Sequence, residues 1–115
     1  MSDIKQLTAK INQFVNERDW KQFHNPKDMA LSLALEAAEV LEHFQWKKPD
    51  EVEAHVVNCK EEIADELADV ACYLLELADN LKIDLSKAVE SKLAKNALKY
   101  PIQKSKGRIT KYTKL

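Results

Sequence analysis

The scarcity of turn-forming residues is the feature that most constrains this chain. Its 115 residues include one glycine and three prolines. The tight hairpins that join the strands of a sheet depend on residues such as glycine, which adopt positive φ angles at little cost. A sheet protein of this length would lack the residues for its turns, and the sequence therefore predicts an all-α domain.

Capping residues and apolar residues at helical spacing mark the first two helices. We expect one helix at about 3–18 with Ser2 as its N-cap, and another at about 26–44 with Asn25 as its N-cap. The second helix is apolar on nearly all sides, so most of its surface must be covered. Because a small domain offers little cover, the sequence predicts a homo-oligomer.

Two further helices complete a four-helix-type bundle. The third is expected to end near residue 81, and the polar stretch 51–60 either begins it or forms a short helix of its own. Asp84 is expected to cap the fourth helix, which must end before Pro101 because proline cannot continue a helix.

Charge and composition exclude several classes of function. The 18 basic and 19 acidic residues nearly cancel, so the chain as a whole has no field that would attract nucleic acid or an anionic membrane. The sequence shows no leader pattern and no uncharged apolar stretch that could span a bilayer, which predicts a cytoplasmic protein. Cys59 and Cys72 lack the spacing of a metal motif and are expected to be reduced thiols.

Two pairs of acidic residues lie on the two most apolar helices. Glu36 and Glu39 are three residues apart, so they share one face of their helix. Glu66 and Asp69 repeat this arrangement on the third helix. If the two helices pack together, the four carboxylates converge, and two like charges about 4 Å apart repel by roughly 4 kcal/mol at an effective dielectric near 20. Such a cluster calls for a cation.

The chemistry of these ligands indicates which cation. Oxygen-only ligands favour a hard ion such as Mg²⁺, with Mn²⁺ as an alternative, over zinc. A ferritin-like di-iron site needs Glu-x-x-His on two helices, but His43 follows Glu39 by four residues and the third helix has no histidine. The competing interpretation is a solvated acidic face paired with lysines. Two pairs on the most apolar helices argue against it.

The acidic pairs and their flanking segments resemble the MazG-like pyrophosphohydrolases. Residues 36–39 (EAAE) and, after 26 intervening residues, 66–69 (ELAD) are similar to the ExxE…ExxD motif of that family. Other segments resemble its dCTP pyrophosphatase branch: Arg18–Pro26, Glu42–Trp46, and Ser91–Asn96 ahead of Tyr100-Pro101. The resemblance covers about residues 20–101. Additional acids leave open which carboxylates bind metal: Glu42, Glu61, Glu62 and Asp65.

The resemblance implies an activity and an assembly. It implies a homodimer or homotetramer that hydrolyses a nucleoside triphosphate to the monophosphate and pyrophosphate, with Mg²⁺ as cofactor. Metal binding and catalysis would belong to the four carboxylates: Glu36, Glu39, Glu66 and Asp69. Mg²⁺ held there would neutralise phosphate charge and bring a water toward the α-phosphorus. One of the same acids would accept the proton of this water, and the sequence does not single it out.

Six other residues are expected to contact the substrate. Lys92 and Asn96 lie four apart on one helix face and suit phosphate binding, and Tyr73 can donate a hydrogen bond. The resemblance implies that three residues shape the nucleobase and sugar pocket: Trp20, His24 and Trp46. Aromatic faces stack on bases of any kind. Each of the three also has an ordinary structural interpretation, as a partly buried anchor or a hydrogen-bonding loop residue.

Residues 102–115 form a basic tail after the expected domain of residues 1–101. Five basic residues surround Gly107: Lys104, Lys106, Arg108, Lys111 and Lys114. The simplest interpretation is a frayed, solvated terminus, and folding of the tail over bound triphosphate is an alternative. Recruitment of a nucleic acid is not favoured, because five charges are a modest basic patch.

Other functions stay open at this point. A hydrolase of the same scaffold can act on phosphoribosyl-ATP, dUTP or a damaged nucleotide, because a pocket of aromatic residues discriminates weakly without hydrogen bonds to the base edge. A non-catalytic oligomeric helical assembly protein is a different class, for which magnesium would leave thermal stability unchanged and loss of Glu66 would be silent. Both removal of non-canonical nucleotides and control of the dCTP pool are compatible with the resemblance.

Overall fold

The computed structural model describes residues 3–115, and no strand occurs among them. The helices are α1 Ile4–Glu17, α2 Pro26–Glu42, α3 Pro49–Asn58, α4 Lys60–Asn80, α5 Leu85–Lys99 and α6 Ile102–Ser105, with 3₁₀ turns η1 Lys21–Phe23 and η2 Tyr112–Lys114. The expected all-α class is confirmed. The chain divides into two compact units, Met1–Lys82 and Ile83–Leu115.

Side-chain caps fix the starts of three helices. α1 begins at Ile4 because the Asp3 carboxylate accepts a hydrogen bond from the backbone N–H of Gln6 at 2.8 Å. The cap of α1 is therefore Asp3, one residue after the expected Ser2, which lies outside the described residues. Asn25 caps α2 and Asp84 caps α5 as expected, each accepting from a backbone N–H in the first turn.

The polar stretch before α4 forms a helix of its own, which settles one alternative left open by the sequence. α3 starts with Pro49 at its first position and ends at Asn58, because the next residue, Cys59, has a φ of −121° and a ψ of 29°, outside the helical range. His43, at the end of α2, and His55 of α3 lie 2.8 Å apart between ring nitrogens Nδ1 and Nε2. This contact ties α3 to the end of α2.

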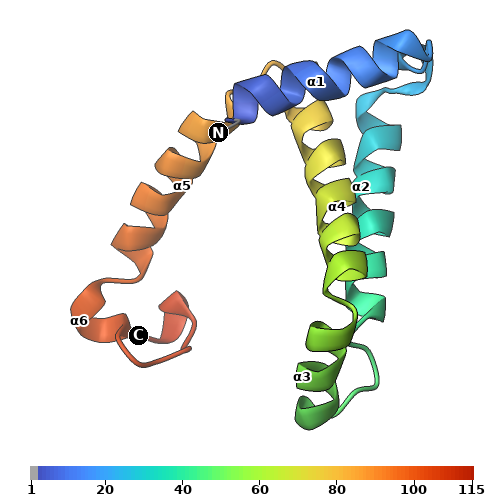
Figure 1. Ribbon diagram of the computed structural model, residues 1–115. Helices are drawn as coiled ribbons and strands as arrows, with labels where there is room; N and C mark the ends of the chain where they lie inside the picture. Colours follow the sequence, from blue (N-terminus) through green and yellow to red (C-terminus); the bar gives the residue numbers. More distant parts are fainter. Residues whose placement is uncertain (1–2) are drawn as a thin grey trace. The chain divides into compact units, whose positions relative to one another are not determined.

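In the first unit, α2 and α4 lie side by side and run in opposite directions, while α1 crosses their ends where α2 begins and α4 finishes (Figure 1). The core of this unit is small and lies at the crossing. Among the described residues of this unit, four are buried: Val15, Met29, Leu75 and Ala78. Met29 is the most enclosed, with 2% of its surface exposed.

Much apolar surface of the first unit is exposed. On α2, Leu31, Leu35 and Leu41 are 53%, 66% and 58% exposed, and Leu67 of α4 is 53% exposed. The cover that the sequence demands for α2 is thus not supplied by its own unit. No described helix is both long and apolar enough to cross a bilayer.

The second unit contains α5, α6 and η2. The rings of Tyr100 and Tyr112 meet edge to face with centroids 5.8 Å apart, and the Lys99 ammonium lies 4.8 Å from the Tyr112 ring centroid. These contacts bring the end of the chain back to the end of α5. Gly107 has a φ of 73° and allows the turn that this return requires.

Candidate metal centre

The four acidic residues singled out in the sequence come together between α2 and α4. Glu36 and Glu39 project from α2, and Glu66 and Asp69 from α4, because a three-residue spacing keeps each pair on one face. One carboxylate oxygen from each residue lies within 4.8 Å of the others. Within residues 3–115, no other set of three or more potential ligands meets this criterion.

Hydrogen bonds inside the cluster shift the pKa values of its glutamates in opposite directions. The Glu39 carboxylate accepts hydrogen bonds from both Glu66 and Glu36, which lowers the pKa of Glu39. The hydrogen bond to Glu39, followed by burial and the surrounding negative charge, raises the pKa of Glu66 to about 7. The same causes raise the pKa of Glu36. The raised pKa values of Glu36 and Glu66 reflect the cost of gathering negative charge here, a cost that a bound cation would offset.

Two buried oxygens of the cluster lack a partner. The Oε2 atoms of Glu36 and Glu66 are buried and have no hydrogen-bond donor among the described residues. A buried polar atom without a partner costs about 1–3 kcal/mol, and more when it is charged. A divalent cation bound by oxygen ligands would satisfy both atoms. Ligands at opposite corners of one Mg²⁺ lie about 4.2 Å apart, so a small contraction or a metal-bound water would complete the site.

The face of α4 that carries the metal ligands continues toward α1. Tyr73 lies one turn beyond Asp69 on this face and is half-buried. Glu76 follows one turn later, with its side chain only 10% exposed. Glu76 was not singled out in the sequence, where a lone glutamate between leucines carries no distinctive spacing. Once Asp69 is taken as a metal ligand, the position of Glu76 two helical turns later places it on the same face of α4.

The expected nucleobase residues do not form one cluster within the chain. His24 and Trp20 precede α2, whereas Trp46 follows it, and the 17 residues of α2 rise about 25 Å. The Trp20 ring packs edge to face on Phe14 with centroids 5.8 Å apart. Trp46 is 91% exposed, in a turn where its own φ is 67°. One chain thus places its two tryptophans at opposite ends of α2.

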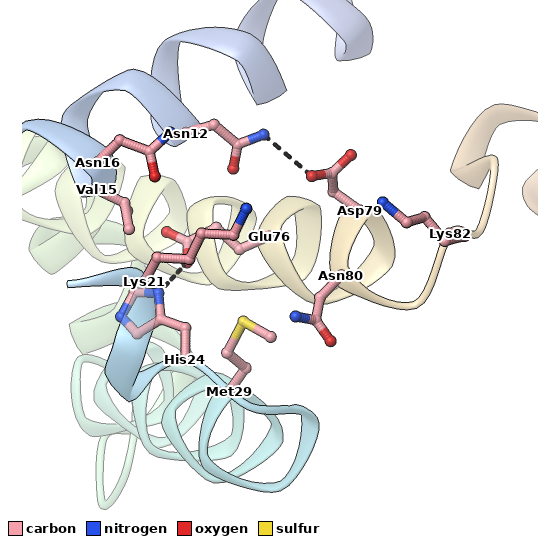
Figure 2. Close-up of a pocket in the computed structure, with 10 residues that line it drawn as sticks. All are labelled: Asn12, Val15, Asn16, Lys21, His24, Met29, Glu76, Asp79, Asn80 and Lys82. Atoms are coloured by element: carbon pink, nitrogen blue, oxygen red, sulfur yellow. Dashed lines mark hydrogen bonds and ion pairs between the residues drawn. The ribbon is translucent and has the colours of Figure 1, made fainter. Parts of the chain in front are cut away.

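A polar cavity of about 100 Å³ lies at the α1 end of the same face (Figure 2). His24 lines it and forms an ion pair with Glu76, with 2.7 Å between Nδ1 and Oε2. Asn12 donates a hydrogen bond to Asp79 across its rim at 3.0 Å. The expected phosphate ligands Lys92 and Asn96 lie on α5, in the second unit.

Comparison with known proteins identifies the family. The MazG-like family model matches residues 31–115, a stretch that contains all four acidic residues of the cluster. The chain belongs to the MazG-like family. Among its relatives, dCTP pyrophosphatase 1 of Rattus norvegicus is 42% identical over all of this chain and 67% of its own length, and the Homo sapiens protein of the same name is 39% identical with the same coverage.

A solved structure supports this assignment at the level of the fold. A pyrophosphatase from Archaeoglobus fulgidus superposes with a TM-score of 0.82 at 38% sequence identity. The match covers 88% of this chain and 94% of the archaeal protein. The MazG-like fold therefore accounts for most of the chain.

Proposed function

We propose that this MazG-like chain hydrolyses nucleoside triphosphates to the monophosphate and pyrophosphate, with a divalent metal, Mg²⁺ or Mn²⁺, held by four carboxylates. The relatives named dCTP pyrophosphatase 1 and the archaeal pyrophosphatase support the reaction class. The observation that carries the metal assignment is the convergence of the oxygens of Glu36, Glu39, Glu66 and Asp69, two of which are buried without a partner.

The burial of the four side chains suggests a division of roles. Glu36 and Glu66 are half-buried and would anchor the metal, while Glu39 and Asp69 are exposed and would lie nearer to the substrate and the attacking water. When bound, the metal would neutralise phosphate charge and polarise the attacking water. The water oxygen bonds to the α-phosphorus as the bond to the bridging oxygen breaks, pyrophosphate leaves, and a carboxylate of the cluster takes the proton.

The basic second unit suits the phosphate end of the substrate. Residues 83–115 contain nine lysine or arginine residues and two acidic ones, whereas residues 1–82 contain nine basic and seventeen acidic ones. An anionic triphosphate is attracted by such a basic segment. We assign phosphate binding to Lys92 and Asn96 and a hydrogen bond to Tyr73. Because the named relatives act on dCTP, dCTP or a modified pyrimidine triphosphate is the proposed substrate.

We further propose that the chain works as a homodimer or homotetramer. The exposed leucines of α2 need cover, and a second copy can provide it. A second copy can also bring its own Trp46 to the end of α2 where Trp20 and His24 lie, which one chain does not do. In such an assembly the nucleobase pocket is shared between subunits.

Replacement of Leu31 with glutamate is expected to reduce the mass of the protein in solution to that of one chain. The introduced charge lies on the apolar face of α2, where burial in an interface without a partner is costly. Analytical ultracentrifugation measures the mass of three proteins: the wild type, L31E and the charge-reversal control K27E. A wild type that sediments as a single chain contradicts the proposed assembly.

The reaction itself is tested by product analysis. The purified protein is incubated with canonical and modified nucleoside triphosphates, with and without Mg²⁺, and the products are separated by chromatography. Monophosphate and pyrophosphate, formed only with metal, are expected, with dCTP or a modified pyrimidine triphosphate turned over fastest. Release of inorganic phosphate instead, or no turnover across a broad panel by folded protein, rejects the proposal.

A further inference from the structure

The cavity beside α1 is built largely from side chains that recognise hydrogen-bonding ligands. Asn12 and Asn16 of α1, Asn80 of α4 and His24 contribute polar groups, and buried Met29 contributes an apolar surface. An amide offers both two donors and an acceptor, which is the combination that a base edge requires. A protein cavity of about 150 Å³ can hold benzene, so a volume of about 100 Å³ that is open on one side suits part of a single ring.

The position of the cavity relates it to the metal centre. Four residues follow one another along one face of α4. Asp69 is a proposed metal ligand, Tyr73 is a candidate hydrogen-bond donor, and Glu76 and Asn80 line the cavity. Seven residues of helix separate Asp69 from Glu76, which is about 10 Å along the axis. This is comparable with the reach of a nucleoside from its α-phosphate to its base. A nucleotide whose α-phosphate lies at the metal can therefore extend its base toward the cavity.

His24 is held in place by Glu76. The two side chains are 20% and 10% exposed, and the carboxylate accepts a hydrogen bond from Nδ1 at 2.7 Å. Burial raises the pKa of Glu76, while the charge of His24 and its hydrogen bond oppose that shift. A carboxylate that accepts from Nδ1 fixes the orientation of the ring and keeps a proton on Nδ1. With Nδ1 held by Glu76, Nε2 is the ring nitrogen left to form a hydrogen bond with a ligand.

We propose that Glu76 is a positioning residue, which holds His24 against the nucleoside part of the substrate, and that Asn16 and Asn80 of the same cavity determine base specificity. The inference rests on the proposed function for the identity of the ligand as a nucleotide. The amides of Asn16 and Asn80 would read the base edge, and Nε2 of His24 would form a hydrogen bond with a polar group of the base or sugar. Hydrogen bonds of this kind supply the discrimination that stacking on tryptophan lacks.

The test separates nucleoside binding from chemistry. Glu76→Gln preserves size but removes the negative charge that accepts the hydrogen bond from Nδ1 of His24, and Asn16→Ala removes one amide. The exposed Glu17→Gln on α1 is the matched control, since it makes the same chemical change away from the cavity. For each protein, kcat and KM are measured with dCTP and dTTP, and the Kd of dCMP is measured by calorimetry without metal.

We expect E76Q to raise the KM for dCTP and the Kd for dCMP about 10-fold, with kcat within twofold, because one charge-assisted hydrogen bond is lost. N16A should reduce the preference between dCTP and dTTP about 10-fold, and E17Q should match the wild type. Unchanged KM, Kd and preference between dCTP and dTTP in both folded variants would show that the cavity holds only water. A fall in Tm at unchanged KM would show that the ion pair between His24 and Glu76 is purely structural.

Failure of the proposed function gives a different result. The wild type could bind dCMP more tightly than E76Q does and yet form no pyrophosphate from any triphosphate. That result would support the nucleoside cavity and reject the proposed reaction. If the wild type forms pyrophosphate with metal and both cavity variants match it, the reaction is supported and the role of the cavity is rejected. If E76Q does not fold, N16A and the conservative Glu76→Asp provide the same comparison.

Discussion

Replacement of Glu66 with glutamine is expected to lower kcat/KM at least about 100-fold while the protein stays folded. Removal of groups that merely orient metal ligands already costs 10–100-fold, so loss of a ligand should cost no less. Glutamine preserves the size of the side chain, but the neutral amide is a far weaker ligand for a hard cation. Steady-state kinetics at saturating Mg²⁺ measure this effect.

The melting temperature of E66Q provides a second test. The folded-state pKa of Glu66 is raised to about 7, so the stabilisation associated with its proton is complete below the ordinary value of 4.5 and is lost as the pH rises through 7. At pH 8 without metal, E66Q should therefore melt at a higher temperature than the wild type. Added Mg²⁺ should raise the Tm of the wild type and leave that of E66Q nearly unchanged.

Glu53→Gln on the exposed face of α3 is the matched control for this experiment. It removes one negative charge from the same unit and should alter neither turnover nor the response of Tm to Mg²⁺. Full metal-dependent activity of E66Q would exclude Glu66 as a ligand. A Tm that does not respond to Mg²⁺ in the wild type would favour the non-catalytic assembly protein instead.

The features that the sequence predicted correctly depend on local chemistry. One glycine in 115 residues excludes a sheet without knowledge of any contact, and Asn25 and Asp84 cap their helices through bonds that span three residues. The convergence of the acidic pairs is a longer step. It was predictable because each pair lies three residues apart on an apolar helix, and two apolar helices of one small domain must pack together.

The features that the sequence did not reveal depend on contacts between distant residues. Glu76 is a site candidate only because His24, 52 positions earlier, is brought to its carboxylate by the turn before α2. The break at Cys59 follows neither a glycine nor a proline, so no local signal separates α3 from α4. The family motif places Trp46 and His24 in one pocket, but within one chain the length of α2 keeps the two side chains apart.

Binding of Mg²⁺ is expected to become tighter as the pH rises to about 7 and to level off above it. Without metal, Glu66 has a pKa of about 7, and the pKa of Glu36 is also raised, so the ion must displace protons below neutral pH. Each displaced proton weakens the apparent affinity up to about 10-fold per pH unit below the pKa. Glu39, whose pKa is lowered, stays ionised and adds no pH dependence in this range.

Titration calorimetry with Mg²⁺ at pH 6, 7 and 8, in buffers of different ionisation enthalpy, measures both the affinity and the protons released. About one proton per ion, from Glu66, is expected at the lowest pH, and almost none at the highest. E66Q should bind weakly at every pH and release fewer protons, because the group with the highest proton affinity is gone. Equal wild-type affinity at pH 6 and 8 would mean that the ion does not displace the proton of Glu66, and the ligand set would then have to be redrawn around Glu39 and Asp69.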